Sequence, residues 1–189
     1  MNVYDFDNTI LKGDSTARFY AYCLIRTPKM LLRLPGLLWG ALFVLRKDKQ
    51  RFKQNMFGFL RDLKDPEGAV EAFWNKNIRR VKPFYLQNRR GDDVIISASP
   101  EFLIKPALAR LGSAAALASP VDIFSGLYHG RNCHGEEKVR RFRERYPDAE
   151  IDEFYSDSHS DDPLAKMAKR AYLVKGEKIV AWEFQQPGA

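Results

Sequence analysis

The sequence predicts an α/β protein in which a parallel sheet, covered by helices in a three-layer core, carries a helical insertion after its first strand. Three short apolar runs each precede a polar turn and a helical pattern: residues 2–6, 93–97 and 151–155. This alternation is typical of a parallel α/β sheet. In the middle of the chain, by contrast, aromatic and leucine residues recur at helical spacing and strand signals are almost absent. We therefore expect a core of residues 1–13 and 87–189 and a helical insertion of residues 14–86.

The remaining elements follow from local signals. Residues 100–111 have helical spacing and stop at Gly112, and residues 135–146 begin with acidic residues and end before a proline. After them the sequence predicts a helix and then two short strands around a Lys-Gly turn: residues 163–170, 171–174 and 179–183. The insertion divides into four predicted helices: residues 15–25, 29–45, 49–63 and 66–81.

The composition is that of a globular protein with an uneven charge distribution. The 189 residues are 45% hydrophobic and 29% charged, which argues against a disordered chain. The net charge of +7 comes from the insertion, since residues 14–83 hold 15 Lys and Arg against 6 Asp and Glu. Such a basic segment suits an anionic partner, whether a phosphorylated substrate, a membrane surface or a nucleic acid. A solvated helical surface would show the same excess.

Several features favour a protein of the reduced cytoplasm. Cys23 and Cys133 lie far apart and form no CxxC pair, so we expect no disulfide framework. The first ten residues have neither the basic start nor the apolar run of a signal peptide. The most apolar stretch, residues 34–45, is twelve residues long. A membrane span needs about 20, so we expect no spanning helix.

Two carboxylates end the first predicted strand, in the run Asp5-Phe6-Asp7-Asn8-Thr9. Residues i and i+2 of a strand point the same way, so Asp5 and Asp7 can face one site. Two carboxylates at such a short distance repel each other unless a cation lies between them or one of them is protonated. An oxygen-seeking ion such as Mg²⁺ suits the pair, although Asp and Asn are also common in solvated turns.

Three further polar clusters follow later strands or begin helices. The run Ser97-Ala98-Ser99 offers a hydroxyl and main-chain N–H groups to a phosphate oxygen, while Ser99 could equally cap the helix that starts at Pro100. Lys138 lies in the first turn of a predicted helix. The loop of residues 156–162 carries three acids, which suggests a metal site or an ordinary acidic loop. Open α/β sheets bind ligands at these strand ends.

Taken in order, these motifs identify a family. A DxDxT run at the first strand, a serine at the second, a lysine at a helix start and a DSxSD loop resemble the haloacid dehalogenase-like hydrolases. The resemblance is to the subgroup related to phosphoserine phosphatase, in which a helical cap follows the first strand of a Rossmann-like core. It spans nearly the whole chain and implies a phosphatase.

The resemblance also implies a role for each residue of the site. Asp5 would attack phosphorus and form an aspartyl-phosphate, and Asp7 would act as general acid and then general base. Mg²⁺ would be held by the Asp5 carboxylate, the Asp7 carbonyl and the Asp157 carboxylate, with Asp161 orienting metal-bound water. Lys138 and the remaining site residues would bind or border the phosphoryl group and the substrate: Thr9, Asp14, Ser97, Ala98, Ser99 and Ser160.

The substrate is left open between two classes. Asp14 matches an acidic residue of the phosphoserine enzymes, but Phe57 stands where their substrate-binding arginine is expected, which argues against phosphoserine. Residues 20–45, with NCHGEEKV and YSDSHSDDPL, resemble the phosphatidylglycerophosphatase C family, which implies a lipid phosphate and peripheral contact of the basic cap with a membrane. A small soluble phosphomonoester is the alternative.

A non-catalytic module is a third hypothesis. A nucleic-acid binder could use the basic insertion, but it has no use for Asp7 and Lys138, so we expect no nucleic-acid partner. The three histidines, His129, His134 and His159, match no common zinc spacing, and polar-loop roles are expected for them. The sequence predicts no particular oligomeric state.

Overall fold

The computed structural model of the protein describes residues 1–33, 54–112 and 115–184. Its centre is a six-stranded sheet with the strand order β3-β2-β1-β4-β5-β6. The strands are β1 (Asn2–Tyr4), β2 (Val94–Pro100), β3 (Ala115–Ser119), β4 (Ile151–Ser156), β5 (Ala168–Lys175) and β6 (Lys178–Ala181). Neighbours pair in parallel except β5 and β6, which form an antiparallel hairpin. The predicted α/β class is confirmed.

The described residues between β1 and β2 form helices rather than strands. Its described helices are α1 (Ser15–Arg26), η1 (Pro28–Arg33), residues 54–57, η2 (Gly58–Asp62), α4 (Pro66–Asn77), η3 (Ile78–Arg80) and α5 (Pro83–Asn88). The helices predicted at residues 15–25 and 66–81 are confirmed by α1 and by α4 with η3. The one predicted at 29–45 begins as a 3₁₀ turn, and its part beyond residue 33 lies outside the described residues. Of the one predicted at 49–63, residues 54–57 are helical and η2 follows.

The core helices are α6 (Glu101–Leu111), α7 (Glu136–Arg145), η4 (His159–Asp161) and α8 (Asp162–Ala165). The sequence prediction was correct for α6, α7 and β6 and wrong in two other places. It missed β3, and it extended the helix after Pro163 to residue 170, so that it began the next strand at residue 171. In the structure α8 ends at Ala165 and β5 begins at Ala168, because this part of the chain pairs with β4.

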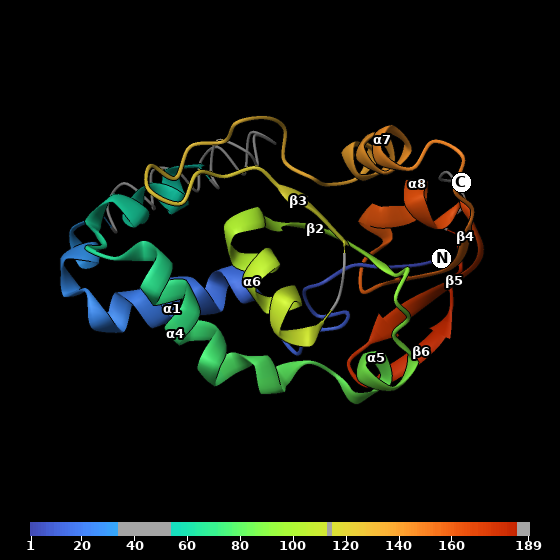
Figure 1. The fold of residues 1–189 in the computed structure, drawn as a ribbon, viewed down its shortest axis with the longest axis horizontal. Helices are drawn as coiled ribbons and strands as arrows, with labels where there is room; N and C mark the ends of the chain where they lie inside the picture. The colour runs from blue at the N-terminus through green and yellow to red at the C-terminus, as the bar shows by residue number, and fades with distance from the viewer. Residues whose placement is uncertain (34–53, 113–114, 185–189) are drawn as a thin grey trace, which may run out of the picture.

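Alternate residues of the strands enter two hydrophobic cores, one on each face of the sheet. Tyr4 and Ile95 pack in the core that contains the buried residues of α6, whereas Val3 and Phe154 pack in the core that contains those of α7 and α8. Side chains of a strand alternate between faces, and parallel sheets are covered on both. The result is a three-layer core (Figure 1), with α1 and α4 at one end of the molecule.

Two antiparallel links join the helical segment to the sheet. Leu11 and Val81 form an isolated antiparallel bridge. Beside it, the Lys12 N–H donates to the Arg80 carbonyl at 2.9 Å, and the Lys82 N–H donates to the Ile10 carbonyl at 2.7 Å. The chain therefore leaves and re-enters the core at one place, next to the end of β1.

A third connection comes from the long segment between β3 and α7, which runs beside the segment containing η2 in Figure 1. Arg61 Nε donates to the Ser125 carbonyl at 2.9 Å, and the Phe57 and Tyr128 rings lie 6.1 Å apart. Gly126 has φ 72°, and a Cβ atom at this position would lie 2.3 Å from the Phe57 carbonyl oxygen. Only glycine allows this approach.

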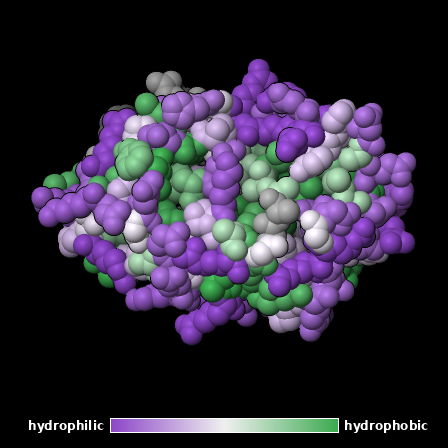
Figure 2. Space-filling model, in the orientation of Figure 1, coloured by the Kyte–Doolittle hydropathy of each residue, from purple (hydrophilic) through white to green (hydrophobic). Residues whose placement is uncertain are grey.

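The surface is mixed in character. On the face shown in Figure 2, hydrophilic residues cover most of the periphery and apolar residues gather in smaller groups between them. Within residues 1–33, 54–112 and 115–184, no helix has the length and apolar character needed to cross a membrane. The apolar stretch at residues 34–45 lies outside the described residues.

Candidate active site

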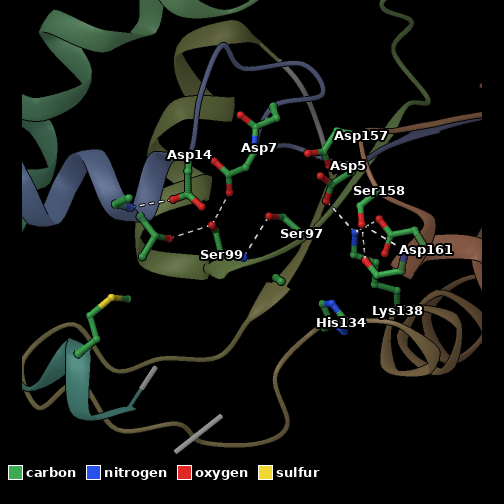
Figure 3. Close-up of a pocket in the computed structure, with 16 residues that line it drawn as sticks. Asp5, Asp7, Asp14, Ser97, Ser99, His134, Lys138, Asp157, Ser158 and Asp161 are labelled. Carbon is green, nitrogen blue, oxygen red and sulfur yellow. Dashed lines mark hydrogen bonds and ion pairs between the residues drawn. The ribbon is translucent and has the colours of Figure 1, made fainter. Parts of the chain in front are cut away.

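A cavity of about 450 Å³ opens at the carboxyl ends of β1, β2 and β4. Figure 3 shows its lining residues, which come from these strand ends, from α7 and from the helical segment. It collects every predicted site residue except Thr9: Asp5, Asp7, Asp14, Ser97, Ala98, Ser99, Lys138, Asp157, Ser160 and Asp161. Residues separated by more than 100 positions in the sequence thus meet where an open α/β sheet binds ligands.

Lys138 connects two carboxylates at the bottom of this cavity. Its Nζ lies 2.7 Å from Asp5 Oδ1 and 2.7 Å from Asp161 Oδ2, and the Lys138 side chain is 3% exposed. Ser156 donates to the same Asp161 oxygen at 2.7 Å. Burial lowers the pKa of Lys138, but the two carboxylates outweigh burial and raise it. Lys138 is therefore a fixed positive charge beside Asp5.

Asp5 is buried at the end of β1. Its main-chain N–H donates to the Tyr155 carbonyl at 2.8 Å, which fixes the residue between β1 and β4. Burial raises the pKa of the Asp5 carboxyl, and the Lys138 ammonium counteracts this. Because the ion pair is short and buried, it favours the ionised form of Asp5.

Asp7 is held by hydrogen bonds to both carboxylate oxygens. The Ser15 N–H donates to Oδ1 at 2.6 Å, and the Ser99 hydroxyl donates to Oδ2. Burial of the carboxyl group, with the negative charge of Asp14 adding to it, raises the pKa of Asp7 to about 6. Asp5 and Asp7 thus share a site but differ in environment, since among the described residues Asp5 contacts a cation and Asp7 does not.

Asn8 makes the turn that follows Asp7. It adopts φ 56°, a left-handed conformation that asparagine tolerates better than most residues. Its N–H donates to the Gly13 carbonyl at 3.2 Å. Two residues earlier, the Phe6 carbonyl accepts from both Ile10 and Leu11, which closes the loop after β1.

Ser97 and Ser99 lie near the carboxyl end of β2, and Ser99 does not take the helix-capping role that was one of the two expected alternatives. Ser99 does not cap a helix, because α6 begins at Glu101 after Pro100 and the Ser99 hydroxyl bonds to Asp7. The Thr16 hydroxyl lies 2.9 Å from the same Ser99 oxygen, and Ser97 Oγ accepts the Ser99 N–H at 3.1 Å. These contacts orient both hydroxyls at the wall of the cavity.

The three remaining predicted site residues, Thr9, Asp14 and Ser160, differ in how they relate to the cavity. Thr9 was expected to bind phosphate, but it is fully buried and its hydroxyl donates to Asp5 Oδ2 at 3.4 Å, so it supports Asp5 from behind. Asp14 lines the cavity and also caps α1, accepting the Ala17 N–H at 2.7 Å. Ser160 lies at the cavity wall, where its hydroxyl contacts that of Ser158 at 3.0 Å.

Other lining residues were not predicted: Asn8, Thr16, Ala17, Met56, His134 and Ser158. Met56 and His134 come from segments brought to the cavity only by the tertiary fold, and no local pattern marks them. The neighbouring Phe57 is 2% exposed and packs against Phe102 and Tyr128 instead of facing the cavity. The side chain at the expected arginine position is therefore not a substrate contact.

The donor set fits a hard divalent cation. Asp161 Oδ1 is buried and has no hydrogen-bond partner in the described part of the chain. Burial also raises the pKa of the Asp157 carboxyl, which faces the cavity. The described residues that line the cavity include five carboxylates and one lysine. An additional positive charge would relieve the repulsion between these carboxylates. Among the described residues no three His, Cys, Asp or Glu side chains cluster as metal ligands.

Comparisons with known proteins agree with this arrangement. The family model of the haloacid dehalogenase-like hydrolases matches residues 3–166. No curated protein matches the sequence at a significant level. Since the family model covers most of the chain, the protein belongs to the haloacid dehalogenase-like hydrolases.

Solved structures resemble this fold at low sequence identity. A protein of unknown function from Bordetella pertussis Tohama I shares 22% identity with a TM-score of 0.71, over 90% of this chain and 87% of the other. A phosphoserine phosphohydrolase-like protein from Francisella tularensis shares 17% identity with a TM-score of 0.54, over 90% and 86%. A phospho-aspartyl intermediate analogue of phosphoserine phosphatase shares 18% identity with a TM-score of 0.52, over 89% and 83%. These likenesses concern the fold.

Proposed function

We propose that this protein is a Mg²⁺-dependent phosphatase that hydrolyses phosphomonoesters through an aspartyl-phosphate on Asp5. One observation carries the proposal: two carboxylates at one strand end have different partners. Asp5 contacts the Lys138 ammonium at 2.7 Å, whereas Asp7 accepts hydrogen bonds from the Ser15 N–H and the Ser99 hydroxyl. Such a difference suits a nucleophile and a general acid working side by side.

In the first step a carboxylate oxygen of Asp5 attacks phosphorus. The bond from phosphorus to the leaving oxygen breaks, and its electron pair stays on that oxygen, which takes the proton of Asp7. In the second step the Asp7 carboxylate removes a proton from water, the water oxygen attacks phosphorus, and the Asp5–phosphorus bond breaks. Inorganic phosphate leaves and Asp5 is an ionised carboxylate again.

The surrounding groups neutralise and align the phosphoryl group. The Lys138 ammonium would contact its oxygens, together with the Ser97 hydroxyl and the main-chain N–H groups of Ala98 and Ser99. Bound Mg²⁺ would supply positive charge at the equatorial oxygens, held by the Asp5 and Asp157 carboxylates and the Asp7 carbonyl. Asp161 would position water near that ion. This water would then be a hydrogen-bond partner for Oδ1 of Asp161.

Residues 14–86 would act as a cap over this site and supply the contacts to the leaving group. Thr16, Ala17 and Met56 line the cavity from this segment, beside Asp14. This wall offers an apolar surface and a carboxylate. Among the described residues, the part of this wall that comes from the helical segment holds no cation for a substrate carboxylate such as that of phosphoserine. Phe57 is buried away from it.

A lipid phosphate is the more specific candidate, and one surface feature favours it. We call residues 25–33 the tip segment. It exposes Ile25 (78%), Leu31 (50%) and Leu32 (83%), whereas Met30 is fully buried and anchors the turn. Its charged residues, Arg26, Lys29 and Arg33, are all basic, and Arg26 and Lys29 are exposed. Exposed aliphatic residues beside basic residues suit the surface of an anionic bilayer.

The proposed activity is tested by a phosphatase screen with Mg²⁺ across phospholipids, phosphoamino acids, sugar phosphates and nucleotides. We expect turnover of at least one phosphomonoester and none after replacement of Asp5 by Asn. Acid-quenched wild-type enzyme should carry one phosphoryl group on the peptide that contains Asp5. Undiminished hydrolysis by Asp5→Asn would exclude the covalent mechanism, and a lack of turnover on all classes would exclude the function.

A further inference from the structure

Lys82 lies on the link by which the chain returns from the helical segment to the core. The residue is 4% exposed, and its Nζ donates to the Asn8 carbonyl at 2.5 Å and to the Gly176 carbonyl at 2.6 Å. Both acceptors are main-chain carbonyls rather than carboxylates. A buried ammonium is costly unless its hydrogen bonds are made, and burial lowers the pKa of Lys82. An apolar side chain would avoid that cost, so the two hydrogen bonds need an explanation.

The first acceptor belongs to the loop that carries the two site carboxylates. Asn8 follows Asp7 directly and adopts the left-handed conformation described above. Asn8 lines the cavity together with Asp7 and Asp157. Lys82 therefore holds the carbonyl of a residue in the cavity wall, directly after Asp7.

The second acceptor belongs to the β5–β6 hairpin. Gly176 forms its turn with φ 63°, and the next residue, Glu177, lies 3.8 Å from Lys12 Nζ on the first link. The Lys82 ammonium thus joins three segments that meet beside β1: the loop after Asp7, the return link and the hairpin turn. The main-chain contact of Lys82 with Ile10 fixes its own position.

We propose that Lys82 is a positioning residue for the catalytic loop. By holding the Asn8 carbonyl it fixes the main chain directly after Asp7, at the wall of the cavity. The reaction it serves is the proposed phosphoryl transfer, so this inference rests on the proposed function. The local effect on the loop, however, does not depend on turnover and can be measured by itself.

The test compares Lys82→Met with Lys12→Met by hydrogen exchange of the purified protein. Methionine keeps the apolar stem of Lys82 and removes its donors. Lys12 is a matched control, because it is a lysine on the adjacent link whose side chain is 68% exposed. We expect the amides of Asn8, Ile10 and Leu11 to exchange at least about tenfold faster in Lys82→Met, with those of α6 unchanged, and no change in Lys12→Met.

Mg²⁺ binding and kinetics complete the test. Calorimetry should show weaker Mg²⁺ binding by Lys82→Met, and kcat should fall about tenfold or more with little change in KM. Lys82→Arg, which can donate to the same carbonyls, should recover part of both losses. Loop exchange at the wild-type rate in Lys82→Met would overturn the proposal, as would a uniform rise that includes α6. A wild-type protein without phosphatase activity would end the proposed function but leave the loop result standing.

Discussion

The Ser99 hydroxyl donates a hydrogen bond to Oδ2 of Asp7, across the gap between the ends of β2 and β1. The other oxygen of Asp7 accepts the Ser15 N–H at 2.6 Å. The carboxyl expected to deliver a proton is therefore held by one residue of the core and one of the helical segment. Its orientation depends on both.

Replacing Ser99 by Ala should lower kcat without unfolding the protein. The change removes a hydrogen bond to a charged group, which typically contributes about 1.5–3 kcal/mol, so we expect a fall of about 10- to 100-fold. The Ser15 contact remains and limits the loss. Steady-state kinetics and thermal unfolding check this, and a variant with wild-type kcat would show that the contact is irrelevant to turnover.

Asp7→Asn should have a larger effect that depends on the leaving group. General acid catalysis contributes about 10²- to 10⁴-fold, so hydrolysis of an alkyl phosphate should fall by that factor. A nitrophenyl phosphate, whose leaving group needs no proton, should be affected much less in the first step. Equal losses on both substrates would assign Asp7 a role other than proton transfer.

Mg²⁺ should raise the thermal stability of the protein, because it would bind carboxylates that repel one another in the folded state. At a concentration about 100-fold above Kd the stabilisation is about 2.7 kcal/mol. EDTA should abolish both the shift in Tm and the activity. Asp157→Asn should reduce the shift, whereas Asp148→Asn, outside the cavity, should keep it. Activity in excess chelator would contradict the assignment of Asp157.

The Glu137 carboxylate should stabilise the protein in a pH-dependent manner. It accepts hydrogen bonds from Arg140 and Arg141, which lower its pKa to about 2. A group whose pKa is lower in the folded state stabilises the fold above its unfolded pKa, near 4.5, and loses that contribution as the pH falls toward 2. Glu137→Gln should therefore cost about 1–3 kcal/mol at pH 7 and progressively less below pH 4.5. Denaturant unfolding at several pH values measures this, and a constant difference would contradict it.

The tip segment should bind vesicles of anionic lipid. Ile25→Asp combined with Leu32→Asp should weaken co-sedimentation at least about tenfold, because it places charge where apolar contact is expected. Both residues are exposed, so Tm should change little. Leu86→Asp is the matched control, since Leu86 is 43% exposed on α5. Binding should also fall as salt rises. Absence of vesicle binding, with turnover of soluble substrates, would leave a small phosphomonoester as the substrate.

The parts predicted from the sequence are those with a local cause. The strands β1, β2 and β4 are short apolar runs, and the helices α6 and α7 have clear ends. In contrast, β3 consists of alanine, leucine and serine, whose weak apolar signal resembles a loop. The helix expected to continue to residue 170 contains good helix formers, but pairing with β4 overrides their preference.

The candidate site shows the same contrast between features with a local cause and features that depend on the tertiary structure. The motifs predicted which side chains meet, because strand ends converge at one edge of a parallel sheet. They did not predict how those side chains are used. Thr9 turns to Asp5, and Ser99 bonds to Asp7 rather than capping α6. Such choices depend on distances of a few ångströms between segments that are far apart in the sequence.

The close approach of Gly126 to the Phe57 carbonyl has a mechanical consequence. A helical segment that is joined to the core by two adjacent links can rotate about those links. Here the segment between β3 and α7 also contacts the helical segment away from these links. The contacts are made by Gly126, by Tyr128 and by the hydrogen bond between Arg61 and Ser125. If the helical segment acts as the proposed cap, its rotation away from the cavity requires these contacts to break. A bulkier residue at position 126 would push these contacts apart. It would therefore change how fast the helical segment rotates and leave the catalytic residues in place.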